Sequence, residues 1–117
     1  MNALGAETLA RLAALAADER KAKDTIILDL RELSPVADFF VLTSGESTPQ
    51  VRAIADYVER KLDEAGAPVP RREGANGARW ILLDYGAVVV HVFHHADREF
   101  YRLEALWDKA PQISVGP

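Results

Sequence analysis

The sequence predicts a single mixed α/β domain in which helices flank a sheet of about five strands. Three observations support this fold class. Apolar residues recur at helical spacing in separate segments, short apolar runs lie between those segments, and turn residues divide them. The chain has 117 residues, enough for one domain with its own core. We assign residues 1–110 to this domain and expect residues 111–117 to form a loose tail.

An alanine-rich segment near the N-terminus is expected to form the first helix, over about residues 3–17, because leucine and alanine recur there at helical spacing. Two apolar runs follow and are predicted to be strands. In residues 26–30 alternate apolar side chains share one face. In residues 39–43 both faces are apolar, which is typical of a central, buried strand.

The next segment carries the clearest helix signals in the chain. Ser47 and Gln50 have the spacing of a capping box, Pro49 falls in the first turn, and Gly66 is suited to end the helix. The apolar residues between these ends form one stripe, made of Val51, Ile54, Ala55, Val58 and Leu62. We therefore predict an amphipathic helix between Ser47 and Gly66.

The C-terminal half is predicted to contain a β-hairpin. Residues 80–84 and 88–93 are apolar runs joined by a three-residue link that contains a glycine, which favours an antiparallel turn. A further strand is compatible with the segment before them. Alternate residues of the first run face opposite sides of the sheet, with Trp80, Leu82 and Asp84 on one side and Ile81, Leu83 and Tyr85 on the other. One side must cover the core, and the other is suited to present an aromatic anchor to a partner.

A last helix is expected after the hairpin, with Asp97 as its N-cap and Pro111 beyond its end. Its packing face would consist of Phe100, Leu103, Leu106 and Trp107. Helices on both sides would hide both faces of the valine-rich sheet.

Composition and charge exclude several function classes. The chain has no cysteine, which excludes disulfides, thiolate metal sites and cysteine nucleophiles. Its net charge is −4 and its basic residues are mostly scattered, so we expect little direct contact with RNA and favour a basic protein partner. No apolar run approaches the roughly 20 residues that span a bilayer, and the N-terminus lacks the pattern of a secretory signal. We therefore expect a cytoplasmic protein that does not enter a membrane.

Three clustered histidines suggest a metal site as one alternative. His91, His94 and His95 lie near the end of a predicted strand, and Asp97 is available as a further ligand. The simpler interpretation is that His91 is a partly buried histidine and that the other two occupy a turn. We therefore expect no metal and no cofactor.

A nucleotidyltransferase-like enzyme or nucleotide-binding protein is the second alternative. Asp29, Asp38 and Asp84 lie at or beside strands, and Ser44-Gly45 precedes a helix N-terminus. However, the order Ser44-Gly45 is the reverse of the Gly-Ser expected for such an enzyme, and no pair of aspartates follows. The structural interpretation is that Gly45 makes a turn, so we expect no catalytic residue.

Seven short motifs then identify a family resemblance. They are residues 26–30 (IILDL), 37–41 (ADFFV), 43–47 (TSGES), 53–56 (AIAD), 80–86 (WILLDYG), 88–93 (VVVHVF) and 100–107 (FYRLEALW). Their order and spacing resemble the ribosomal silencing factor, or Iojap-related, family over residues 20–109. The resemblance implies a fold similar to nucleotidyltransferases but without their active site. It also implies a translation repressor that binds the large ribosomal subunit through ribosomal protein L-fourteen, blocks joining of the small subunit by steric exclusion, and lowers translation under nutrient limitation.

The resemblance also implies a partner-binding surface on the hairpin. The corresponding residues here are Trp80, Leu82, Leu83, Asp84, Tyr85, Gly86 and Ala87, and Glu73 in the preceding loop would add charge. Trp80 would be the anchor, and Asp84 would face a basic partner. Ala87 departs from the family, which usually has Asp there; that carboxylate either contacts the partner or merely fixes the turn. Exposed apolar residues near Trp80 are also compatible with a homodimer off the ribosome.

Overall fold

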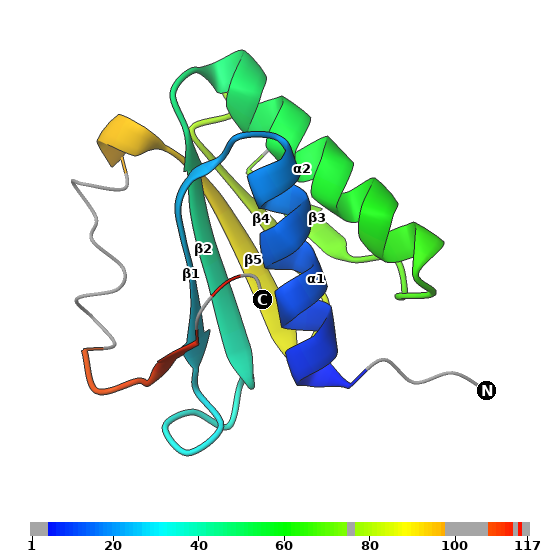
Figure 1. Ribbon diagram of the computed structural model, residues 1–117, viewed down its shortest axis with the longest axis vertical. Helices are drawn as coiled ribbons and strands as arrows, with labels where there is room; N and C mark the ends of the chain where they lie inside the picture. Colours follow the sequence, from blue (N-terminus) through cyan, green and yellow to red (C-terminus); the bar gives the residue numbers. More distant parts are fainter. Residues whose placement is uncertain (1–4, 75–76, 98–107, 114, 116–117) are drawn as a thin grey trace.

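The computed structural model describes residues 5–74, 77–97, 108–113 and 115, and consists of a mixed sheet with two helices on one side (Figure 1). The elements are α1 (Ala6–Glu19), β1 (Lys23–Asp29), β2 (Phe39–Gly45), α2 (Thr48–Glu64), β3 (Arg71–Glu73), β4 (Trp80–Asp84), β5 (Val88–His94) and β6 (Gln112–Ile113). The predicted mixed α/β fold is confirmed, with six strands in place of about five. No helix among the described residues is long and apolar enough to cross a membrane.

The strand order in the sheet is β3-β4-β5-β2-β1-β6. β2 and β5 pair in parallel, and the other neighbouring strands are antiparallel. The predicted hairpin is confirmed, with Trp80 opposite Phe93 and Asp84 opposite Val89. β2 is an interior strand, as its apolar sequence predicted, because it lies between β5 and β1.

Helix α2 begins and ends where the sequence predicted. The Ser47 side chain accepts a hydrogen bond from the backbone nitrogen of Gln50 at 3.2 Å. The return bond differs from that of a capping box, since the Gln50 side chain accepts from the backbone nitrogen of Glu46 at 2.7 Å. At the other end Gly66 adopts a φ of +96°, and the backbone nitrogens of Gly66 and Ala67 donate back to Asp63 and Leu62. This arrangement is a Schellman motif, and it stops the helix.

The main core lies between the two helices and the sheet face that they cover. Alternate residues of the strands point into it, including Ile27, Val41, Ile81, Leu83 and Val90, all with no exposed surface. From α1 the buried residues are Leu9, Ala10, Ala13, Ala14, Ala16 and Ala17. Leu15 of the same helix is 39% exposed. Alanine at the contact lets the helix approach the sheet closely, and α1 also packs against α2.

The opposite sheet face holds a second, smaller and more aromatic cluster. Its buried members are Leu28, Leu30, Leu42, Phe93 and Ala110, with Ile26, Phe40 and Trp80 packed against them. Both described helices lie on the other side of the sheet. The predicted last helix cannot be compared, because residues 100–107 lie outside the described part of the chain. Residues 95–97 are already helical, so Asp97 is not the N-cap that the sequence predicted.

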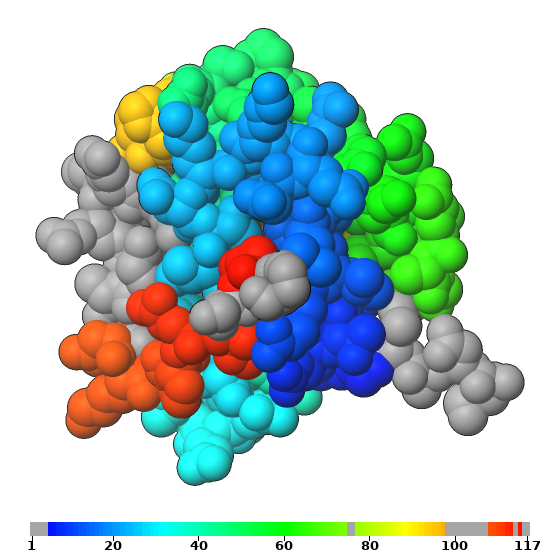
Figure 2. All heavy atoms as spheres, viewed as in Figure 1, coloured from blue at the N-terminus to red at the C-terminus, as the bar shows by residue number. Residues whose placement is uncertain are grey.

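The expectation of a loose tail from residue 111 onward is wrong for Gln112 and Ile113. These two residues form β6, which pairs with β1 through Leu28 and Ile27. Ile113 and Val115 then pack against the main core, and Figure 2 shows the red C-terminal atoms lying against the blue atoms of α1. Gln112 and Ile113 are held because they pair with the edge of β1, and the side chains of Ile113 and Val115 are partly buried against the core.

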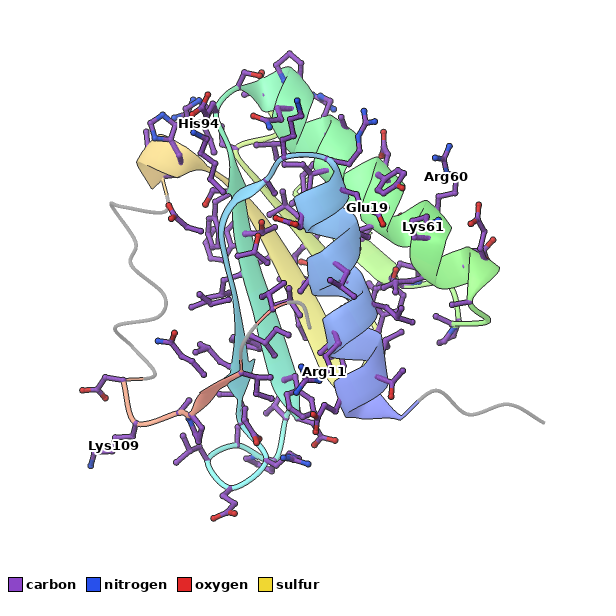
Figure 3. All side chains as sticks on the ribbon, in the orientation of Figure 1. Arg11, Glu19, Arg60, Lys61, His94 and Lys109 are labelled. Carbon is purple, nitrogen blue, oxygen red and sulfur yellow. The ribbon has the colours of Figure 1, made fainter. Side chains whose placement is uncertain are left out.

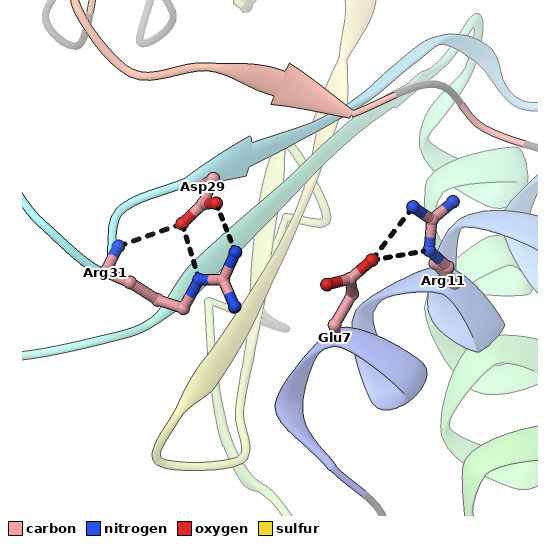
Figure 4. A network of polar contacts seen from close by, with 4 residues as sticks. All are labelled: Glu7, Arg11, Asp29 and Arg31. Atoms are coloured by element: carbon pink, nitrogen blue, oxygen red, sulfur yellow. Dashed lines mark hydrogen bonds and ion pairs between the residues drawn. The ribbon is translucent and has the colours of Figure 1, made fainter.

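Ion pairs and cation–aromatic contacts occupy the outer surface. Glu7 pairs with Arg11 on α1, and Asp29 pairs with Arg31 just after β1 (Figure 4). On the helical side the hydroxyl of Tyr57 donates to Glu19, and Figure 3 labels Glu19 together with Arg60 and Lys61, whose charged groups lie over the Tyr57 ring. Solvent screens these exposed contacts, so they contribute little to stability.

Candidate protein-docking surface

Four of the predicted site residues lie together on the sheet face away from the helices. Strand register places Glu73 opposite Leu82, and strand alternation puts Trp80 and Asp84 on the same face. Trp80, Leu82 and Asp84 are half-buried, and Glu73 is exposed. We call Glu73, Trp80, Leu82 and Asp84 the docking surface. It combines an aromatic residue, an aliphatic residue and two carboxylates, which suits a basic protein partner.

Leu83 and Tyr85 lie on the helix-covered side instead. Leu83 has no exposed surface, so in this structure its side chain is not accessible for the partner contact predicted for it. Tyr85 packs against the main core, and its buried hydroxyl has no hydrogen-bond partner among the described residues. Burial, together with the nearby carboxylates of Glu59 and Asp63, raises the pKa of Tyr85 well above its usual value. The alternation that exposes Leu82 is what buries Leu83.

The turn of the hairpin is fixed without a polar side chain at position 87. Gly86 has a φ of +88°, in the left-handed region that favours glycine. An Asp84 carboxylate oxygen accepts from the backbone nitrogen of Gly86 at 2.8 Å. The carbonyl of Ala87 accepts from the backbone nitrogens of Asp38 and Phe39, at 2.7 and 3.1 Å. A carboxylate at position 87 is therefore not needed to form this turn.

Trp80 is held by a residue that the sequence did not assign to the site. Its indole nitrogen Nε1 donates to Nδ1 of His91 at 3.1 Å. The Trp80 ring also lies against Phe93, with ring centroids 4.9 Å apart. His91 is 4% exposed, and burial lowers its pKa to about 4. The imidazole is therefore neutral near pH 7, which leaves Nδ1 free to accept the bond.

The three histidines do not form the metal site considered from the sequence. Among the described residues, no group of three His, Cys, Asp or Glu side chains is placed to hold a metal ion. His94 and His95 stack on each other with ring centroids 5.2 Å apart. His94 also accepts from the backbone nitrogen of Ala96, and Nδ1 of His91 is used by Trp80.

The features that suggested nucleotide chemistry have structural roles. Asp29 accepts three hydrogen bonds from Arg31, and this contact holds the pKa of the carboxyl below its usual value. Ser44 is buried, with 1% of its surface exposed. Gly45 lies so close to the first turn of α2 that an added Cβ would be 3.1 Å from the backbone nitrogen of Val51. Glycine at this position therefore permits close packing of strand and helix.

Comparison with known proteins identifies the family to which this chain belongs. The family model described as "Ribosomal silencing factor during starvation" matches residues 3–117. The chain belongs to the ribosomal silencing factor family. It is 45% identical to the ribosomal silencing factor RsfS of Bacillus subtilis over 105 residues, which cover 90% of this chain and 89% of the relative. The resemblance drawn from the seven motifs is thus confirmed.

Two further relatives extend this result. A crystal structure of a Chromobacterium violaceum protein matches with a TM-score of 0.86 and 38% identity, covering 97% of this chain and 95% of the other. A mouse protein named "Mitochondrial assembly of ribosomal large subunit protein 1" is 29% identical over 92 residues, which cover 76% of this chain and 40% of the mouse protein. The family relatives are named as silencing or assembly factors and not as enzymes.

Proposed function

We propose that this protein represses translation by binding the large ribosomal subunit and blocking its joining with the small subunit. The match to the silencing-factor family over residues 3–117 is the observation that carries the proposal. The name of the mouse relative supports the large subunit as the partner. On this proposal the protein acts by occupying a surface, so it needs no catalytic residue.

The finer proposal is that the docking surface contacts ribosomal protein L-fourteen. Trp80 supplies an aromatic anchor that is partly exposed, and Leu82 extends the apolar area beside it. Asp84 and Glu73 supply negative charge at the edge, which is partly offset by Arg71, since Arg71 lies opposite Asp84 and pairs with Glu73 at 3.3 Å. The whole chain carries a net charge of −4. A basic protein surface meets this pattern with complementary charge, which speeds encounter and excludes acidic partners. Nutrient limitation is the condition under which we expect this repression to matter.

Co-sedimentation with purified large subunits tests the first step. We expect the wild-type protein to sediment with large subunits at near-physiological salt, and Trp80→Ala to weaken binding by at least about 30-fold, as truncation of an interface anchor costs about 2 kcal/mol or more. Leu15→Ala is the matched control, because Leu15 is also partly exposed but lies on α1, away from the docking surface. Failure of the wild-type protein to sediment with large subunits would refute the proposal.

Two further assays separate the finer parts of the proposal. Adding the protein before small subunits should reduce the yield of joined ribosomes, and Trp80→Ala should restore it. Purified ribosomal protein L-fourteen should bind the wild-type chain, and it should bind the control variant Leu15→Ala with the same affinity. If large subunits bind the chain while isolated L-fourteen does not, the contact lies on another component of the subunit.

A further inference from the structure

The Trp80 indole has a single polar group, and that group is already bonded inside the protein. The indole nitrogen can only donate a hydrogen bond, and it carries one hydrogen. That hydrogen goes to Nδ1 of His91, which lies on the neighbouring strand β5 and is 4% exposed. What remains of Trp80 at the surface is therefore hydrocarbon.

His91 is held in a ring of aromatic side chains that limits its movement. The Phe40 ring lies on one neighbouring strand, with its centroid 4.6 Å from that of the imidazole. The Phe93 ring stacks nearly parallel to the imidazole at 6.0 Å, with an interplanar angle of 9°. Packing of this kind leaves the imidazole few alternative rotamers. The acceptor atom is therefore presented to Trp80 in a fixed position.

Burying the imidazole of His91 costs stability, and this cost suggests that its hydrogen bond to Trp80 has a role in function. Because Nδ1 accepts, the hydrogen of the neutral imidazole sits on Nε2, and Nε2 has no hydrogen-bond partner among the described residues. A buried donor without a partner is destabilising, and an aliphatic side chain at this position would avoid that cost. Among the described residues, the one side-chain hydrogen bond of His91 goes to Trp80 of the docking surface.

We propose that His91 is a positioning residue for docking, which fixes the Trp80 indole in one orientation and withdraws its N–H from the partner. Trp80 then enters an apolar pocket of the partner protein through its hydrocarbon edge. This inference rests on the proposed function, since it concerns the same surface. Fixing the anchor beforehand reduces the rotamer freedom lost on binding. An apolar pocket also leaves no acceptor unpaired when it receives the ring.

Binding of four variants to purified large subunits tests the inference. We expect His91→Leu to weaken binding about 5- to 10-fold, which corresponds to the loss of one hydrogen bond and one fixed side chain. His91→Asn keeps an acceptor near the position of Nδ1 and should bind within about twofold of the wild type. Trp80→Phe has an apolar ring but no N–H. Adding His91→Leu to Trp80→Phe should therefore change binding by less than about twofold.

The indole proton signals show whether a variant acts through this bond. The chain has two tryptophans, so Trp80→Phe assigns the Trp80 signal by its disappearance from the NMR spectrum. In His91→Leu that signal should move and exchange faster with water, while circular dichroism stays that of the folded wild type. In His91→Asn the signal should remain close to the hydrogen-bonded position.

The outcomes distinguish this inference from the function on which it rests. If the wild-type protein does not bind large subunits, the proposed function fails and the positioning role fails with it. If the wild type binds, Trp80→Ala does not, and His91→Leu binds like the wild type, only the positioning role is overturned. The same conclusion follows if His91→Leu weakens binding equally with and without Trp80→Phe, because His91 would then act independently of the indole.

Discussion

The two faces of the sheet are built from the same strands but have different chemistry. On the helix-covered face β4 and β5 contribute five aliphatic side chains with no exposure: Ile81, Leu83, Val88, Val90 and Val92. On the opposite face the same strands contribute Trp80, Leu82, Asp84, Val89, His91 and Phe93. One hairpin thus places a buried aliphatic set on one face and the proposed docking surface on the other, since strand geometry separates the two sets.

The largest expected effect comes from a matched pair of leucines. Leu83 has no exposed surface, so Leu83→Ala should lower the free energy of unfolding by about 2–5 kcal/mol through lost burial and a cavity. Leu82 is half-buried on the other face, so Leu82→Ala should cost less than about 1 kcal/mol. Urea unfolding of the two variants measures both values. Equal losses would show that the two faces do not differ as described.

The second prediction concerns the pH dependence of folding stability, which we attribute to His91 on the aromatic face. The pKa of His91 is about 4 in the folded chain, against an ordinary value of 6.5, because burial disfavours the charged form. Between these values the unfolded chain binds more protons, so stability is fully present above pH 6.5 and is lost as pH falls towards 4. The loss attributable to His91 should be about 3 kcal/mol.

Denaturant unfolding of the wild type and His91→Leu at a series of pH values checks this assignment. His91→Leu should remove this part of the slope between pH 6.5 and 4 while leaving other titrations in place. An unchanged slope in His91→Leu would mean that other groups cause the pH dependence.

A third, smaller effect should show that large subunits bind the sheet face of Leu82 and not the helical side of Leu15. Leu82→Ala should weaken binding to large subunits by about 5- to 30-fold, the equivalent of roughly 1–2 kcal/mol of lost apolar contact. Leu15→Ala removes the same atoms from α1, on the other side of the molecule, and should bind like the wild type. If Leu15→Ala were the variant that weakened binding, docking would occur through the helical side.

The smallest expected effect is at the turn. Ala87 is exposed, and its carbonyl already anchors the turn to the start of β2, so Ala87→Asp should leave stability nearly unchanged. A carboxylate at such a rim should tighten binding to a basic partner by about 0.2–1 kcal/mol. Affinity measured at low and high salt checks this, because the gain should shrink as salt rises. Weaker binding by Ala87→Asp at low salt would contradict the expected basic partner.

Local signals in the sequence predicted some parts of this fold and could not predict others. The ends of α2 followed from Ser47, Pro49 and Gly66, because capping depends on neighbouring residues. The faces of β4 followed from alternation. The strand at Gln112–Ile113 was missed, since two residues carry no periodic signal and their pairing with β1 joins segments more than 80 residues apart. His91 was considered as a metal ligand, whereas its contact with Trp80 depends on strand register.

The sequence by itself determined the family, the hairpin, the α2 helix and the residues that alternate along β4, because each depends on order and short-range spacing. Only the tertiary structure decided which alternating set faces outward, that Leu83 is buried while Leu82 is accessible, and that Trp80 is bonded to His91. The physical reason is that the covered face is chosen by where α1 and α2 pack. That choice is made by contacts between segments far apart in the chain, and no local pattern records it.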